Sequence, residues 1–186
     1  MKKFLKWMVG ILAVLVLLVV FVGWPYMQKQ TKKISPEQIV TYKQGGQDIA
    51  VFYCRPYKKD REIFGGLVPY GKVWRTGANE PSTFETANDL TIDGKTLPAG
   101  KYTLWTIPGE NSWEVIFNSK MYGWGVTILS GGKETPREPE ADALIISVPV
   151  QKSPTITEQF TIAFEDTPST AMTLAWDQTK ISVPFQ

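Results

Sequence analysis

Histidine is absent from the 186 residues, and cysteine occurs once, as Cys54. Without histidine, the chain cannot build a Ser-His-Asp or Cys-His nucleophile system, a histidine-ligated zinc site or a histidine pH switch. A single cysteine forms neither an internal disulfide nor a thiolate metal cluster, and in an apolar strand it is most often a small buried hydrophobe. These absences favour a non-enzymatic protein with no catalytic residue, no metal site and no cofactor.

Charged residues are absent between Lys6 and Lys29, and residues 8–27 are almost entirely apolar. Twenty helical residues rise about 30 Å, the thickness of the hydrocarbon core of a bilayer. Leu and Val on every side leave no polar face, so the pattern is not that of an amphipathic core helix. Trp24 and Tyr26 stand at the end of the run, where such rings favour the headgroup region. The sequence therefore predicts one transmembrane helix.

An uncleaved signal anchor is our interpretation of this helix, and a cleaved signal peptide is the alternative. The apolar run exceeds the usual 7–15 residues of a signal peptide, and no Ala-x-Ala cleavage site follows it. Three lysines lie on each side of the run, so the positive-inside rule hardly distinguishes the two orientations. We expect a cytoplasmic stub at 1–7, a membrane span at 8–27, a stalk at 28–38, and a domain at 39–186 that faces the periplasm.

The basic charge of the chain belongs to its N-terminal part. Residues 1–33 contain six lysines and no acidic residue, so 14 basic and 18 acidic residues remain, a net charge of −4. A mildly acidic domain makes nucleic acid a poor partner. About 150 residues are enough for one domain with a substantial core.

Beyond residue 38 the apolar pattern has a period of two, with frequent Gly, Pro and Asn-rich breaks. Asp93-Gly94 is a preferred type I′ turn pair, and no helical crossover of the length that parallel strands need is visible. The sequence predicts an all-β fold, an antiparallel β-sandwich of jelly-roll type. The predicted strands cover 39–43, 48–55, the hairpin 90–97, 101–107, 113–118, 125–129, 144–150, 159–164, 170–176 and 180–185.

Residues 55–85 depart from this alternation and contain three of the four arginines. Loops on a rigid sheet often hold binding groups. An arginine fork, an amide, a carboxylate and an aromatic face together suit a polar ligand such as a glycan or a peptide terminus. The candidate ligand-binding residues are Trp74, Arg75, Asn79, Glu80, Arg55 and Arg61. The alternative is structural: Arg75 and Glu80 form an ion pair, Trp74 belongs to the core, and Gly77 supplies an unusual backbone angle.

Three further patterns give weaker signals. Glu80 and Glu85 could serve as a pair of glycosidase carboxylates, but their odd separation would place them on opposite faces of a strand. A cluster of acidic residues could hold Ca²⁺, and consists of Glu134, Glu138, Glu140 and Asp142. Its spacing is not that of an EF-hand, so we interpret it as a solvated acidic loop. Residues 131–133 lack the first glycine and the hydroxyl residue of a phosphate loop.

Several motifs of the domain recur together in one known family. They are Arg55-Pro56, Arg61, the run 67–80 with its Trp-Arg-Thr-Gly-Ala-Asn string, the hairpin 92–104, and 107–118. With these motifs the chain resembles the bacterial domain of unknown function 2911 family. The resemblance covers nearly the whole domain and implies a β-rich protein of the bacterial cell envelope, without implying an activity. Members usually carry Ser where Cys54 stands, and the N-terminal span departs from members with a simple cleavable signal.

Our leading hypothesis is a membrane-anchored, extracytoplasmic binding or interaction module for a glycan, a peptide or an envelope protein. The second hypothesis is a hydrolase or lyase that uses the arginine and carboxylates of residues 74–85. The third is a structural envelope subunit whose loop contacts another protein.

Overall fold

The computed structural model describes residues 2–127, 130–132, 134–167 and 169–186. The chain divides into two compact units, Met1–Ile34 and Ser35–Gln186, each with its own internal contacts.

The first unit is helical throughout its described residues. It consists of α1 (Lys2–Leu18), a π-helical segment, η1 (Val19–Gly23), and α2 (Trp24–Ile34). Pro25 explains the interruption, because proline has no N–H for the bond to the carbonyl four residues earlier. The helix widens just before it, and the N–H of Trp24 bonds instead to the carbonyl of Val19.

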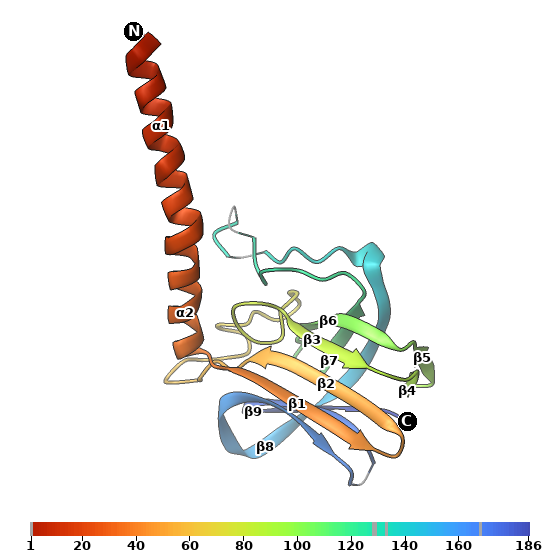
Figure 1. The fold of residues 1–186 in the computed structure, drawn as a ribbon. Coiled ribbons are helices and arrows are strands. Elements are labelled where there is room, and N and C mark those ends of the chain that lie inside the picture. Colours follow the sequence, from red (N-terminus) through yellow and green to blue (C-terminus); the bar gives the residue numbers. More distant parts are fainter. Residues whose placement is uncertain (1, 128–129, 133, 168) are drawn as a thin grey trace. The chain divides into compact units, whose positions relative to one another are not determined.

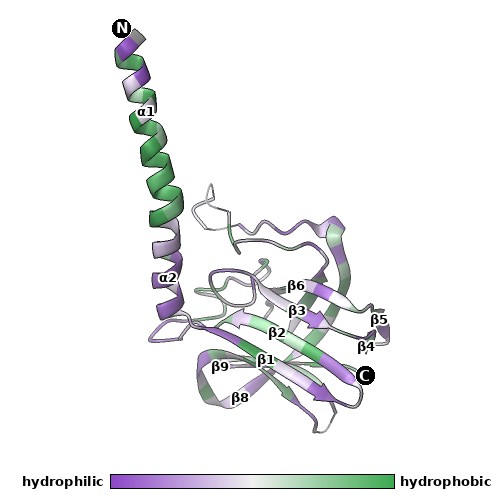
Figure 2. Cartoon of the chain, in the orientation of Figure 1, coloured by the Kyte–Doolittle hydropathy of each residue, from purple (hydrophilic) through white to green (hydrophobic). Residues whose placement is uncertain are grey.

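Hydrophobic residues follow one another along most of α1 and η1, and hydrophilic residues gather at the start of α1 and along α2 (Figure 2). The large apolar side chains of α1 and η1 are exposed. The helical stretch Lys3–Ile34 is long and apolar enough to cross a membrane, by length and composition. A signal sequence would have the same properties. The predicted long apolar helix is therefore confirmed, as a membrane anchor or a signal sequence.

The second unit is an antiparallel β-structure, as predicted (Figure 1). Within the described residues, β4 (Leu90–Ile92) and β5 (Lys95–Leu97) form a separate small hairpin. The main sheet has the order β1 (Glu37–Gln44), β2 (Gln47–Cys54), β3 (Ser82–Thr86), β6 (Gly100–Ile107), β7 (Ser112–Asn118), β8 (Asp142–Glu165) and β9 (Ala171–Pro184).

The main sheet curls because β8 is long enough to belong to both of its halves. The first part of β8 pairs with β7, and its later part pairs with β9. An isolated bridge between Tyr57 and Gln159 then joins the far end of β8 to the chain that follows β2. The hydroxyl of Tyr53 contacts both the N–H and the carbonyl of Ile162, at 3.0 and 3.2 Å. One curled sheet thus supplies both layers of the fold.

The structure corrects the predicted strands in four places. The strands predicted at 144–150 and 159–164 are one strand, β8, and those at 170–176 and 180–185 are likewise one strand, β9. Residues 125–127 form no strand, and 128–129 lie outside the described residues. β3 was missed, because it lies within the segment interpreted as a loop.

The core between the two layers is rich in aromatic rings. Phe64, Trp74, Trp113, Phe160 and Trp176 form one cluster, with neighbouring ring centroids 4.7–6.2 Å apart. Most pairs meet edge to face, the arrangement that the ring quadrupoles favour. The cluster forms the base on which the irregular segment after β2 lies.

Candidate functional site

The segment between β2 and β3 is fastened to the sheet at Trp74. Trp74 and Thr106 of β6 exchange two backbone hydrogen bonds, of 2.7 and 3.0 Å. The hydroxyls of Thr76 and Thr106 lie 3.1 Å apart beside this bridge. Because the bridge fixes the backbone on both sides of Trp74, it also fixes the direction in which Arg75 leaves the chain.

The indole of Trp74 belongs to the core, as the structural alternative expected. It is 8% exposed, its Nε1 donates to the carbonyl of Gly77 at 3.0 Å, and its ring stacks on Trp176 at 5.9 Å. Gly77 has a φ of 148°, and a Cβ there would lie 2.8 Å from the carbonyl oxygen of Cys54. The predicted stacking face of Trp74 is therefore occupied by its neighbours.

Arg75 is a mostly buried cation with an unsatisfied donor. Its Nε is fully buried and has no hydrogen-bond partner, and burial lowers the pKa of its guanidinium. The salt bridges found among the described residues do not include Arg75. An arginine remains charged even so, and an unmet buried donor costs about 1–3 kcal/mol.

Gly125 holds the side chain of Arg75 in place. A Cβ at Gly125 would lie 2.1 Å from Cδ of Arg75 and 2.9 Å from the carbonyl oxygen of Asn79. The N–H of Gly125 donates to that same carbonyl at 3.1 Å. Only a residue without a side chain leaves room for Arg75 to lie across the backbone here.

Arg75 and Trp74 line a cavity of about 620 Å³. One wall comes from the loop after β2, and the opposite wall comes from the segment before β8. The other lining residues are Leu67, Val68, Pro69, Lys72, Val73, Val126, Gly132, Glu134 and Thr135. Among the described residues of the lining, the ionisable groups are two cations, Lys72 and Arg75, and one anion, Glu134. The sequence argument missed Lys72 and the whole opposite wall.

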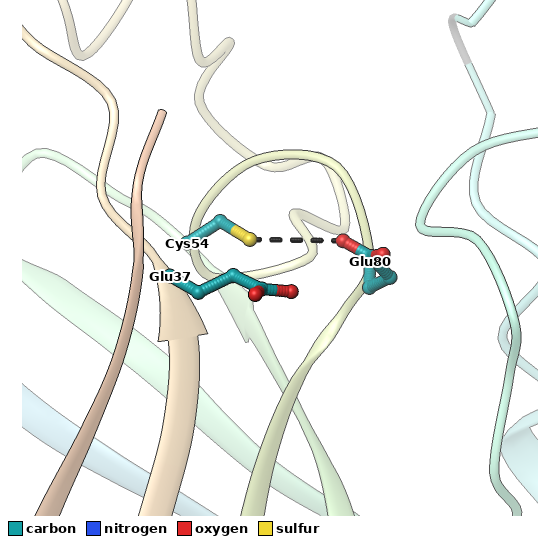
Figure 3. A group of neighbouring side chains, drawn as sticks. All are labelled: Glu37, Cys54 and Glu80. Atoms are coloured by element: carbon teal, nitrogen blue, oxygen red, sulfur yellow. Dashed lines mark hydrogen bonds between the residues drawn. The ribbon is translucent and has the colours of Figure 1, made fainter. Parts of the chain in front are cut away.

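Glu80 lies with Cys54 and Glu37 in a second group (Figure 3). Asn79 lies beside it and interacts with the thiol of Cys54. The thiol of Cys54 lies 3.7 Å from Oε2 of Glu80, and the Nδ2 of Asn79 donates to the carbonyl of Ser35 at 3.5 Å. Glu37 is the cross-strand partner of Cys54 in the β1–β2 hairpin.

The ligand atoms of Glu37, Cys54 and Glu80 lie within 4.8 Å of one another, close enough to share a cation. Burial is the main cause that raises the pKa of the Cys54 thiol to about 11, and the two carboxylates add to it. The thiol is therefore protonated at neutral pH and acts as a donor to Glu80. A metal would first have to displace that proton.

Arg55 and Arg61 do not line the cavity. Arg55 donates from Nε to the carbonyl of Phe160 at 3.1 Å and from a terminal nitrogen to the hydroxyl of Thr161 at 2.9 Å. Arg61 is exposed and donates to the carbonyls of Tyr57 and Lys58 in its own turn. The guanidinium of Arg55 joins two strands, and that of Arg61 braces a turn.

The weaker acidic patterns meet basic partners in the structure. Glu85 is exposed and lies 3.4 Å from Lys101 across β3 and β6, on the surface of the sheet. In the acidic loop, Glu138 forms a salt bridge with Lys120, and Asp142 forms one with Arg137. Of residues 131–133, Gly132 lines the cavity, and Lys133 lies outside the described residues.

Comparison with known proteins gives one match. The model of a family described as "Protein of unknown function (DUF2911)" matches residues 35–185, which are almost the whole second unit. This match confirms the resemblance seen in the sequence. No curated protein and no solved structure matches the chain.

Proposed function

As a member of the DUF2911 family, whose description assigns no activity, the chain must be interpreted from its own geometry, and we propose that it is a membrane-anchored module that binds a polar ligand. The observation that supports this proposal is the mostly buried side chain of Arg75, a cation that lines a cavity. The ligand is a peptide, a glycan or a group on an envelope protein.

A mostly buried arginine whose Nε–H is buried without an acceptor reduces stability in the free protein. Natural proteins carry such unfavourable groups mainly where function requires them. An anionic group in the cavity would pair with the positive charge of Arg75, and Lys72 in the same lining would add a second positive charge.

The apolar helix gives this module its location in the proposal. As an uncleaved anchor with a short cytoplasmic stub, it would keep the second unit in the periplasm, beside the membrane. Protease treatment of intact spheroplasts tests this arrangement: the second unit should be digested, and a retained helix should remain in the membrane fraction. Protection of the whole chain would contradict the proposed orientation.

Binding is tested with a glycan and peptide array, probed with the full chain in detergent micelles. The wild type should retain a subset of ligands, and Arg75→Gln should lose them. Lys43→Gln is the matched control, since Lys43 forms an exposed pair with Asp48 at 3.0 Å in the first hairpin. Uniform silence of the wild type on the array would contradict ligand binding and favour the structural envelope subunit, which crosslinking in membranes would detect.

A hydrolase or lyase is the second candidate, because Glu80 is half-buried beside Cys54. Glu85 cannot be its partner in this structure, since its carboxylate is exposed beside Lys101. Turnover of an array ligand that stops in Glu80→Gln, while binding persists, would favour this candidate over a pure binding module.

A further inference from the structure

The cavity beside Arg75 has a composition that restricts its ligand. We propose that it takes the free carboxyl terminus of a peptide whose last side chain is apolar, an inference that rests on the proposed function above. Three features support it: two cations in the described part of the lining, the planar shape of the arginine group, and the aliphatic character of the walls.

The charge favours an anion. Among the described residues of the lining, Lys72 and Arg75 provide two positive charges and Glu134 one negative charge. The planar guanidinium of Arg75 also matches the two oxygens of a carboxylate in a bidentate pair.

The walls favour an apolar group next to the carboxylate. Leu67, Val68, Pro69, Val73 and Val126 contribute aliphatic surface. At about 620 Å³ the cavity falls within the usual range for small-ligand sites, roughly 300–1,000 Å³, which is room for the last one or two residues of a peptide.

A sugar ring fits the same walls poorly. Trp74 is the only aromatic residue among the described residues that line the cavity, and its ring stacks on Trp176 within the core. With 8% of the residue exposed, it offers no free face on which a sugar could stack. Among the ligand classes considered, the peptide terminus is the one that both the charges and the walls suit.

Gly125 is a positioning residue in this assignment. Because its missing side chain makes room for Cδ of Arg75, a methyl group there would displace the guanidinium from the cavity wall. Gly125→Ala should therefore reduce the preference for a carboxylate without removing any charge from the site.

The test is calorimetric titration of the full chain in detergent micelles with two probes, N-acetyl-glycyl-leucine and its carboxamide. These differ by a single charge at the terminus. We expect the free acid to bind at least tenfold more tightly than the amide. Arg75→Lys keeps the charge but loses the fork, and it should reduce this ratio to threefold or less. Gly125→Ala should reduce it similarly, and Lys43→Met should leave it unchanged.

Several results would overturn the assignment. If acid and amide bind equally and both weaken in Arg75→Lys, the cavity binds a ligand but does not select a carboxyl terminus. Tighter binding of a glycan or of inorganic phosphate at Arg75 would assign another ligand class. If no peptide, glycan or phosphate binds, the proposed function fails together with this inference. An acid-to-amide ratio that Arg75→Lys leaves intact would place the carboxylate elsewhere.

Discussion

Arg55 and Arg75 lie near opposite ends of the segment between β2 and β3, and their side chains differ in their hydrogen-bond partners. Arg55 donates from Nε to the carbonyl of Phe160 and from a terminal nitrogen to the hydroxyl of Thr161. These two hydrogen bonds link the end of β2 to the late part of β8. Arg75 is also largely buried, but its Nε has no acceptor. The sequence alone does not distinguish the two arginines, but their hydrogen bonding in the structure differs.

This difference separates a structural role from a functional one. A buried cation with good acceptors holds the curled sheet together, and its removal leaves those acceptors unmet. A buried cation without an acceptor contributes little to holding the fold, so its retention requires another explanation. The largest predicted effects concern the framework around the two arginines, and the smallest concerns Arg75 itself.

Trp74→Ala should have the largest effect on stability. Trp74 packs against four aromatic neighbours in the core, so its truncation should cost about 3–5 kcal/mol in the free energy of unfolding. Urea denaturation monitored by circular dichroism measures this cost. A loss below about 1 kcal/mol would mean that the indole is not a core residue, and it would reopen the prediction that its face stacks on a ligand.

Arg55→Met should cost about 2–3 kcal/mol, because hydrogen bonds to a charged group are worth more than neutral ones and two of them are lost. The same denaturation experiment measures it. Arg61→Met is the comparison, since Arg61 is exposed and bonds only within its own turn; its loss should be below about 1 kcal/mol. Equal losses for the two variants would remove the structural role assigned to Arg55.

The thiol of Cys54 should make the free energy of unfolding depend on pH, by about 2 kcal/mol. Its pKa rises from 9.0 in an unstructured chain to about 11 in the fold, because burial favours the protonated thiol. The resulting stability is fully present below pH 9 and is lost as the pH rises through 11. Denaturation at pH 8, 9.5 and 11 should show a steeper decline for the wild type than for Cys54→Ser. Parallel declines would contradict the raised pKa.

The sequence predicted the local features of the fold and missed those that depend on distant contacts. Gly45-Gly46 and Asp93-Gly94 form their turns with positive φ at both central residues, as type I′ hairpins require. The two-residue turn at Gly45-Gly46 also sets the register that pairs Glu37 with Cys54. That pairing could have been derived from the hairpin alone.

The missed elements have physical reasons. β3 shows the expected alternation only at Ser82, Phe84 and Thr86, which is too short to stand out beside a long polar segment. β8 stays extended through irregular pairing between Lys152 and Thr161, where Ser153-Pro154 reads as a turn. The cavity joins Lys72 to Val126, and packing between distant loops, rather than any local pattern, sets that proximity.

Arg75→Met tests the central claim most directly, because stability and binding should change in opposite directions. Removing a side chain whose Nε–H is buried without an acceptor should leave the free energy of unfolding unchanged or raise it by about 1–2 kcal/mol, and it should abolish the tighter binding of N-acetyl-glycyl-leucine over its amide. Urea denaturation and calorimetric titration on the same preparation give both values. A variant that is less stable by more than about 1 kcal/mol and still prefers the free acid would show that Arg75 serves the fold and not a ligand.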